Sequence, residues 1–240
     1  MISKTYELGT LKHYKYVVVL SEYNEKILLS RHKERKTWET QGGHIENGET
    51  PLEAAKRELF EESGAVDFEI IPFCDYWAGN PDTGEGANGM VFTAAINRLD
   101  KLPESEMAEV KTFDQLPKEL TYPAITTVLF AKKQIGKSVT VTVDRKMGTF
   151  HPKHYDIFYS VNYGYVDGVV GGDGDMQDAY IIGVSVPVDS FDGVIKAVVH
   201  RFDDDEDKWV VCPKNYELTE NEVLEKLHFQ EKYFKSCIIM

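Results

Sequence analysis

Short apolar runs separated by turn residues dominate the first half of the chain. Four of these runs predict strands: residues 16–20, 26–30, 69–73 and 90–96. The first two flank the polar segment 22–25, which is typical of a β-hairpin. The segment 79–86 is rich in Gly, Asn, Pro and Asp, and it predicts a loop between the last two. We therefore expect a sheet in this half.

A helix is predicted immediately before the third of these strands. Thr50 is a good N-cap, Pro51 suits the first helical position, and Glu53 completes a capping box with Thr50. Gly64 is a helix stop. The helix should therefore run from about Pro51 to Ser63.

One face of this helix is expected to be apolar. Leu52, Ala55 and Leu59 recur at helical spacing and should pack on the sheet. Residues 121–133 predict a second helix, with Pro123 in its first turn.

The best domain boundary lies at Gly136–Lys137. After it, residues 139–143 begin a new strand pattern, followed by short strands and Gly-containing turns. Thr219 and Glu222 predict a capping box for a closing helix that should reach about Lys235. We therefore divide the chain into domains 1–133 and 137–240.

The net charge of the chain bears on which molecules it can bind. The chain has 27 Lys and Arg against 40 Asp and Glu, a net charge of −13. Such a surface argues against binding to nucleic acid or to an anionic membrane. A phosphorylated substrate would need metal ions or local Arg and Lys to offset the acidity.

Cysteine usage and the chain ends suggest a cytoplasmic protein. Cys74, Cys212 and Cys237 are too far apart for a disulfide framework or a metal-ligand spacing. No apolar run approaches the length of a membrane span, and the first residues lack a signal-peptide core. The last four residues, 237–240, fit a prenylation pattern. We interpret them instead as an apolar tail that packs on a core.

The strongest chemical signal lies on the first helix. Glu58, Glu61 and Glu62 occupy positions i, i+3 and i+4, so their carboxylates share one face and repel one another. A hard divalent cation such as Mg²⁺ or Mn²⁺ would reverse that repulsion and would take substrate phosphates as further ligands. The alternative is a solvated acidic face, which is common.

The wider pattern distinguishes these alternatives. From Gly43, five residues lead to Glu49, and seven more lead to Arg57, followed by Glu-Leu-Phe-Glu-Glu-Ser-Gly-Ala over residues 58–65. This resembles the Nudix box, with Ala65 small for its apolar position. Gln41 stands where many members have a proline, and we expect it to change loop stiffness without abolishing the chemistry.

The resemblance covers about residues 1–133 and implies a sandwich of a mixed sheet between helices. It also implies Mg²⁺- or Mn²⁺-dependent hydrolysis of a nucleoside diphosphate linked to another group. Glu58, Glu61, Glu62 and the carbonyl of Gly42 would be metal ligands, and one glutamate would activate water. Arg57 would brace the loop through Glu49. Glu106 or Glu109 would supply a further ligand, with spacing favouring Glu106.

Substrate choice is less well defined. The box resembles those of members that act on nucleoside triphosphates, including those that clear oxidised nucleotides. Pro81 lies sixteen residues after Ala65, a spacing that resembles ADP-ribose-cleaving members, although a proline also suits a turn. The basic residues of 31–36 are either phosphate contacts or a solvated loop. Trp38, Tyr76 and Trp77 are either base-stacking or core residues.

A second constellation lies after the boundary. Asp173, Asp175 and Asp178 have the spacing D-G-D-x-x-D in a Gly-rich turn and follow a tyrosine-rich strand at 159–165. Three aspartates in this arrangement either converge on a cation or form an acidic turn.

With the preceding N-Y-G-Y, this segment resembles family I inorganic pyrophosphatases, whose fold is a small five-stranded β-barrel with helices. The resemblance implies metal binding by Asp173, Asp178 and Asp207, with Asp203 as a further candidate. It implies that Asp175 is the base for the attacking water. It also implies phosphate contacts from Arg145, Tyr163, Lys208 and Tyr233.

The second resemblance has departures. Met176 and Gln177 replace the usual residues inside the motif, the N-terminal part of the family is missing, and Phe234 replaces a lysine. We expect an α+β protein with three open interpretations. The chain is a nucleotide pyrophosphohydrolase whose second domain also hydrolyses pyrophosphate, or a Nudix hydrolase with a non-catalytic phosphate- or metal-binding module, or a silent nucleotide sensor.

Overall fold

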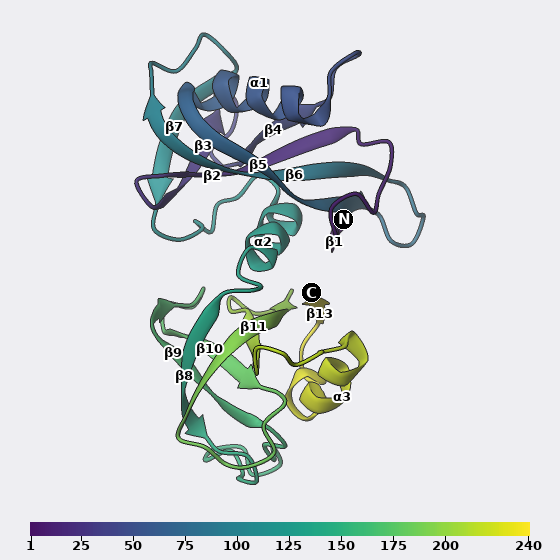
Figure 1. The fold of residues 1–240 in the computed structure, drawn as a ribbon, viewed down its shortest axis with the longest axis vertical. Coiled ribbons are helices and arrows are strands. Elements are labelled where there is room, and N and C mark those ends of the chain that lie inside the picture. The colour runs from purple at the N-terminus through teal and green to yellow at the C-terminus, as the bar shows by residue number, and fades with distance from the viewer. The chain divides into compact units, whose positions relative to one another are not determined.

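The computed structural model describes residues 1–240 and divides into two compact units, Met1–Phe130 and Ala131–Met240 (Figure 1). The division falls inside helix α2 (Pro123–Lys132), close to the end of the first expected domain at residue 133. None of the helices combines the length and the apolar character needed to cross a membrane.

The first unit is built on a seven-stranded mixed sheet. Its order is β1-β5-β6-β2-β3-β7, with β4 paired to β2. Strands β2 and β6 are parallel, and the other pairs are antiparallel. The strands are β1 (Ile2–Tyr6), β2 (Tyr16–Tyr23), β3 (Lys26–His32), β4 (Gln41–His44), β5 (Ala65–Gly79), β6 (Gly86–Leu99) and β7 (Met107–Phe113).

The predicted hairpin of β2 and β3 is confirmed. Strands β2 and β3 meet at a tight turn, where Asn24 and Glu25 both adopt positive φ angles of 53° and 62°. Strands β5 and β6 form a long antiparallel hairpin, and the turn-rich segment predicted as a loop connects them. Strands β1, β4 and β7 were not predicted.

Helix α1 (Pro51–Ser63) begins and ends where the sequence predicts. The capping box between Thr50 and Glu53 is present in both directions, and Gly64 closes the helix in the left-handed conformation at φ 75°. The predicted apolar face was wrong at one position, because Leu52 is 37% exposed, whereas Ala54 is buried.

Two apolar clusters cover opposite faces of the sheet. Val17 and Val19 of β2 point to the same cluster as Ala55 and Leu59 of α1. Leu20 of β2 belongs to the other cluster, with Leu129 of α2. The sheet is therefore sandwiched between helices, and α1 is seen along one face of it in Figure 1.

The second unit is a closed barrel of five strands. β12 pairs with β10 and with β11, so the order β12-β10-β9-β8-β11 returns to its start. Strand β13 adds to β11 outside this ring. The elements are β8 (Ser138–Arg145), β9 (Asn162–Val170), β10 (Met176–Ile181), β11 (Ser190–Arg201), β12 (Lys208–Cys212), α3 (Glu220–Glu231) and β13 (Ser236–Ile239).

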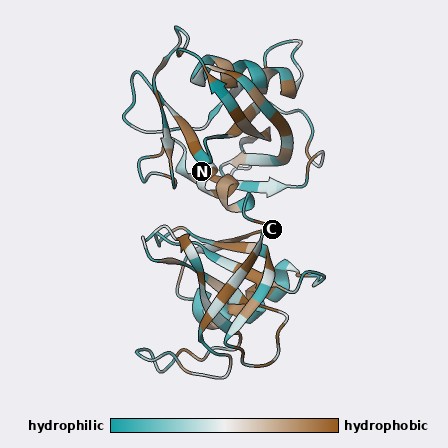
Figure 2. Cartoon of the chain, turned by 60° about the vertical axis from the view of Figure 1, so that its left-hand side comes forward, coloured by the Kyte–Doolittle hydropathy of each residue, from teal (hydrophilic) through white to brown (hydrophobic).

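The barrel core contains Tyr159, Tyr163 and Tyr180 together with Val223 and Leu227 of α3. Brown and teal residues interchange along the barrel strands in Figure 2, as expected for strands with one buried face. Tyr159 itself precedes β9, which begins only at Asn162, so the tyrosine-rich strand starts later than predicted.

Helix α3 is shorter than predicted. Thr219 caps it by accepting from the Glu222 N–H, but it ends at Glu231 and does not reach Lys235. The chain turns at this point to form β13, whose hydrogen bonds with β11 replace further helical ones. Ile239 is buried in β13, so the interpretation of an apolar tail packed on a core is confirmed.

Candidate functional site

The loop that begins with β4 is fastened to the end of α1. Gly42 and Gly43 pair with Val18 and Val17 of β2, which places this backbone beside the helix. The backbone N–H of Gly42 donates to Oε2 of Glu62 at 2.7 Å. Gly42 of the loop and Glu62 of the helix, both predicted as site residues, are therefore in direct contact.

Arg57 brings the remaining box residues together. Its guanidinium donates twice to Glu49, at 2.7 and 3.0 Å, and once to the carbonyl of His44 at 3.1 Å. The same group donates to Oε1 of Glu58 at 2.8 Å and to Oε2 of Glu61 at 3.2 Å. Arg57 thus joins the loop to two of the three glutamates, using the planar fork that suits bidentate carboxylate binding.

Burial raises the pKa of two of the glutamates. Glu62 is 5% exposed, and burial raises its pKa to about 9. The Gly42 N–H opposes this rise, whereas the charges of Glu58, Glu39 and Glu106 add to it. Burial also raises the pKa of Glu58, against the effect of Arg57. A cation bound nearby would stabilise the charged form of such carboxylates and lower their pKa again.

The donor set fits Mg²⁺ or Mn²⁺, since it consists of partly buried carboxylates that repel one another on one helix face. As the side chains stand, no three His, Cys, Asp or Glu residues gather around one point. Arg57 takes one oxygen each of Glu58 and Glu61, and Gly42 takes one of Glu62. The ligand set of Gly42, Glu58, Glu61 and Glu62 therefore remains a prediction.

The two candidates for a further carboxylate ligand have different surroundings. The charge of Glu106 adds to the rise in the pKa of both Glu58 and Glu62, and its Oε2 lies 3.9 Å from Nε2 of His32. Glu109 instead forms an ion pair with Arg31 at 2.8 Å. This difference favours Glu106, as did the spacing.

Most of the predicted phosphate-contacting bases already have acidic or carbonyl partners. Arg31 binds Glu109, Lys33 binds the carbonyl of Ser105, and Arg35 binds Glu39 at 2.7 Å. Glu39 was missed by sequence reasoning, although it is buried and its charge acts on Glu62. Among the aromatic candidates, Tyr76 lies in the core.

In the second unit, a lysine joins the predicted site residues. Lys208 is buried and forms ion pairs with Asp178 at 2.5 Å and with Glu206. Tyr163 donates its hydroxyl to the same Asp178, and burial raises the pKa of this phenol far above its usual value. The structure thus brings together Tyr163, Asp178 and Lys208.

Glu206 is the member of this cluster that sequence reasoning missed. Burial raises its pKa to about 7, although Lys208 opposes the rise. Its Oε1 also accepts from the backbone N–H of Asp178 at 3.2 Å. The only signal for it was its place in the acidic run 203–207, where the aspartates drew attention.

The other predicted residues of this unit have different partners. Asp173 accepts from the N–H of Asp175 at 2.9 Å, and both lie in the exposed turn before β10. Asp207 binds the ring of His200 at 2.7 Å. Arg145 pairs with Asp144 at 2.6 Å, Tyr233 donates to Asp156 at 3.2 Å, and Asp203 accepts from the N–H of Lys235. The three aspartates of the motif do not converge on one point.

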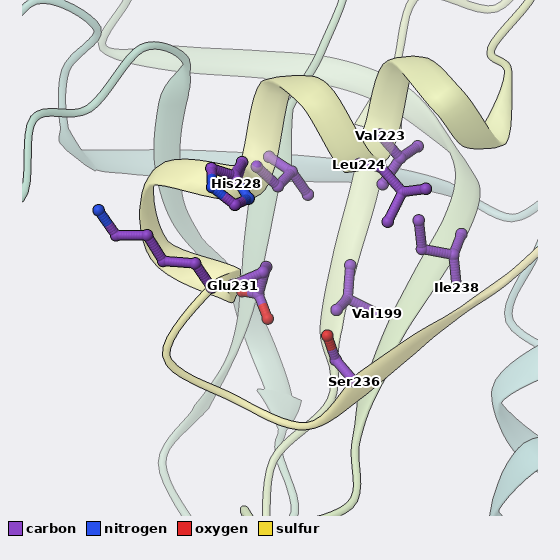
Figure 3. Close-up of a pocket in the computed structure, with 9 residues that line it drawn as sticks. Val199, Val223, Leu224, His228, Glu231, Ser236 and Ile238 are labelled. Carbon is purple, nitrogen blue, oxygen red and sulfur yellow. The ribbon is translucent and has the colours of Figure 1, made fainter.

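A separate pocket lies between α3 and the strands β11 and β13 (Figure 3). Val199, Leu227 and Ile238 supply apolar walls, and His228 and Glu231 supply polar ones. None of the predicted site residues lines it.

Comparison with known proteins supports the first of the two resemblances. The model of the NUDIX domain family matches residues 12–129. A putative 8-oxo-dGTP diphosphatase of Bacillus subtilis is 43% identical over 49 residues, 20% of this chain and 32% of that protein. An RNA pyrophosphohydrolase of Bartonella henselae is 36% identical over 55 residues, 22% of this chain and 32% of that protein. The chain thus spans about a third of the length of these relatives.

Solved structures of two kinds are similar to the chain. A Bacillus subtilis pyrophosphohydrolase covers 55% of this chain and 87% of its own, at 22% identity and a TM-score of 0.47. An inorganic pyrophosphatase from Ehrlichia chaffeensis covers 42% and 84%, at 16% identity and a TM-score of 0.35. The family match, the complete box and the Arg57 contacts agree, and residues 12–129 of this chain are a Nudix domain.

Proposed function

We propose that the first unit is a Mg²⁺- or Mn²⁺-dependent hydrolase of phosphoric anhydride bonds. Its substrate would be a nucleoside diphosphate linked to another group, with nucleoside triphosphate-type substrates favoured. The observation that carries the proposal is the contact set of Arg57, which fixes Glu49, Glu58 and Glu61 in one array beside Glu62.

Each residue of this array has a part in the proposal. Glu58, Glu61 and Glu62 would hold the metal together with the Gly42 carbonyl and Glu106, and one of the three would orient and deprotonate water. The bound ion would neutralise the diphosphate and lower the pKa of that water. Arg57 would keep Glu58 and Glu61 in place through contacts that leave one oxygen of each carboxylate to other partners.

For the second unit, we propose a phosphate- or metal-binding module of the pyrophosphatase type that retains turnover only if Asp175 acts as a base. Asp178 and Lys208 are the residues that support binding, because a buried lysine between two carboxylates is a site of strong local charge. Metal contacts from Asp173, Asp178 and Asp207 and phosphate contacts from Arg145, Tyr163, Lys208 and Tyr233 belong to this proposal.

If both units turn over, pyrophosphate released by the first would be consumed by the second, which would draw the first reaction forward. This coupling requires that the first unit releases pyrophosphate. Release of inorganic phosphate alone would rule it out.

The test is product analysis with Mg²⁺ on nucleoside triphosphates, ADP-ribose, dinucleoside polyphosphates and free pyrophosphate. Glu61→Gln should abolish nucleotide cleavage. Glu53→Gln is the matched control, since it lies on the same helix and a glutamine still serves the capping box. No cleavage of any nucleotide by a metal-binding wild type would support a silent sensor.

The same assay decides the role of the second unit. Pyrophosphate turnover lost in Asp175→Asn but kept in Glu61→Gln would show two working sites. Nucleotide cleavage with no pyrophosphate turnover would leave the second unit as a binding or structural module. ADP-ribose cleavage at the expense of triphosphates would reverse the favoured substrate.

A further inference from the structure

Gln41 is a fully buried polar residue at the start of the active-site loop. It lies in β4 opposite Val19 of β2, and its side chain is 0% exposed. A buried amide without partners would cost about 1–3 kcal/mol. Its hydrogen bonds therefore show what the position is built to connect.

The Gln41 amide is bonded at both ends to buried serines. Its Oε1 accepts from the hydroxyl of Ser21 at 2.6 Å, and its Nε2 donates to the hydroxyl of Ser30 at 2.7 Å. Both serines are buried, one in β2 and the other in β3. Gln41 thus ties the loop to the two strands beneath it.

The Ser30 hydroxyl continues this chain to the helix. It donates to the backbone carbonyl of Glu62 at 2.8 Å. Because a hydroxyl has one proton, Ser30 spends it on Glu62 and must accept from Gln41, which fixes the direction of the relay. The Ser21 hydroxyl donates its proton to Gln41 itself, so this bond does not lead on to α1.

Two links therefore run from adjacent residues of β4 to the same glutamate. The side chain of Gln41 reaches the Glu62 backbone through Ser30, and the N–H of Gly42 holds the Glu62 carboxylate. We propose that Gln41 is a positioning residue that, through Ser30, sets the Glu62 carboxylate and the Gly42 backbone at the distance the divalent cation requires. This inference rests on the metal site of the proposed function.

The two serines provide a matched pair of variants for the test. Ser30→Ala and Ser21→Ala each remove one buried hydroxyl and its hydrogen bond to the Gln41 amide, although after Ser30→Ala the Nε2 keeps its 3.5 Å bond to the carbonyl of Leu28. Only Ser30→Ala breaks the path to Glu62. A purely structural role predicts that neither variant changes the affinity for Mn²⁺ in the folded protein, whatever its cost in stability.

The experiment measures Mn²⁺ binding to the full-length chain by electron paramagnetic resonance of the free ion. Mn²⁺ that binds the wild type but not Glu58→Gln is assigned to the α1 site. Ions bound by the second unit are unaffected by this substitution and are therefore excluded. Ser30→Ala and Gln41→Leu should weaken this Mn²⁺ about 10- to 100-fold, as loss of outer contacts to metal ligands does. Ser21→Ala should leave it at the wild-type affinity.

Equal Mn²⁺ affinities in the two serine variants would overturn the inference, as would the absence of any Mn²⁺ sensitive to Glu58→Gln. If Gln41→Leu does not fold, the serine pair still decides the result. Failure of the proposed function is separate, because Mn²⁺ would then bind at α1 with the expected pattern while no nucleotide is cleaved. If nucleotides are hydrolysed but Ser30→Ala and Ser21→Ala bind Mn²⁺ equally well, the positioning role is rejected and the proposed function stands.

Discussion

The carboxylate of Glu58 occupies the space that a side chain on Gly43 would need. A Cβ placed on Gly43 would lie 2.2 Å from Oε1 of Glu58. At Gly42 the obstacle is different, since a Cβ there would lie 2.3 Å from the backbone carbonyl oxygen of Val17. The two glycines of the loop therefore protect different parts of the structure.

This contrast predicts that Gly43→Ala lowers activity whereas Gly42→Ala lowers stability. In Gly43→Ala the obstacle is the end of a flexible side chain, so Glu58 should rotate away, with nucleotide turnover falling at least about 10-fold and little loss of stability. In Gly42→Ala the obstacle is backbone, so the pairing of β4 with β2 should be disrupted and the free energy of unfolding should fall. Urea unfolding and steady-state kinetics on both variants test this. Equal loss of stability in the two would contradict it.

Arg57→Lys keeps the positive charge but removes the guanidinium, and we expect it to show that the charge alone does not support activity. A lysine cannot bind Glu49 twice while also reaching Glu58 and Glu61. We expect kcat to fall about 10- to 100-fold, with a smaller change in KM, because the carboxylates proposed to hold the metal lose their common support. Arg98→Lys is the control, since Arg98 pairs with Asp100 on the surface. Wild-type kcat in Arg57→Lys would refute this role.

Lys208→Met should destabilise the second unit strongly. The variant leaves Asp178 and Glu206 without their buried cation, and loss of one partner of a buried ion pair costs about 3–5 kcal/mol. Lys146→Met removes the exposed pair with Asp189 and should cost less than about 1 kcal/mol. Urea unfolding with fluorescence detection measures both, and similar costs for the two variants would show that the Lys208 cluster is solvated.

Tyr14 should contribute to stability in alkaline solution. Its hydroxyl donates to Asp75 at 3.0 Å, and burial together with this carboxylate raises its pKa from 10.0 to about 12. The folded state favours the neutral phenol, so this contribution is complete below pH 10 and is lost as the pH rises to about 12. The free energy of unfolding should fall more steeply over this interval in the wild type than in Tyr14→Phe. Parallel slopes would contradict the assignment, and Tyr155→Phe serves as an exposed control.

Local signals explain why α1 was predictable and why its buried face was not. Thr50, Glu53 and Gly64 act within a few residues of themselves, so the ends of the helix follow from short-range chemistry. The buried face instead includes Glu62 and Ser63, because Gly42 from another element binds Glu62. Apolar spacing alone assigned Leu52 to that face.

Long-range pairing explains what was missed at both sites. Glu39 and Glu206 look like ordinary acidic residues, but Glu39 is buried where its backbone pairs with Ser30, and Glu206 is buried where its carboxylate accepts from the N–H of Asp178, 28 residues away. Gln41 was recognised only as a departure from a family pattern, since its serine partners are 20 and 11 residues away in the chain. The box residues could be named from sequence, but the contacts that orient them could not.

The closure of the five-stranded ring has a consequence for the behaviour of the protein at high concentration. Strand edges with unpaired backbone groups are templates for association between chains. Because β12 pairs on both sides, the ring leaves no such template, and β13, which covers β11 beyond β8, is only four residues long. Intermolecular sheet extension from this unit would therefore begin at the outer edge of β13, and a strand of four residues gives an incoming strand few backbone groups to pair with.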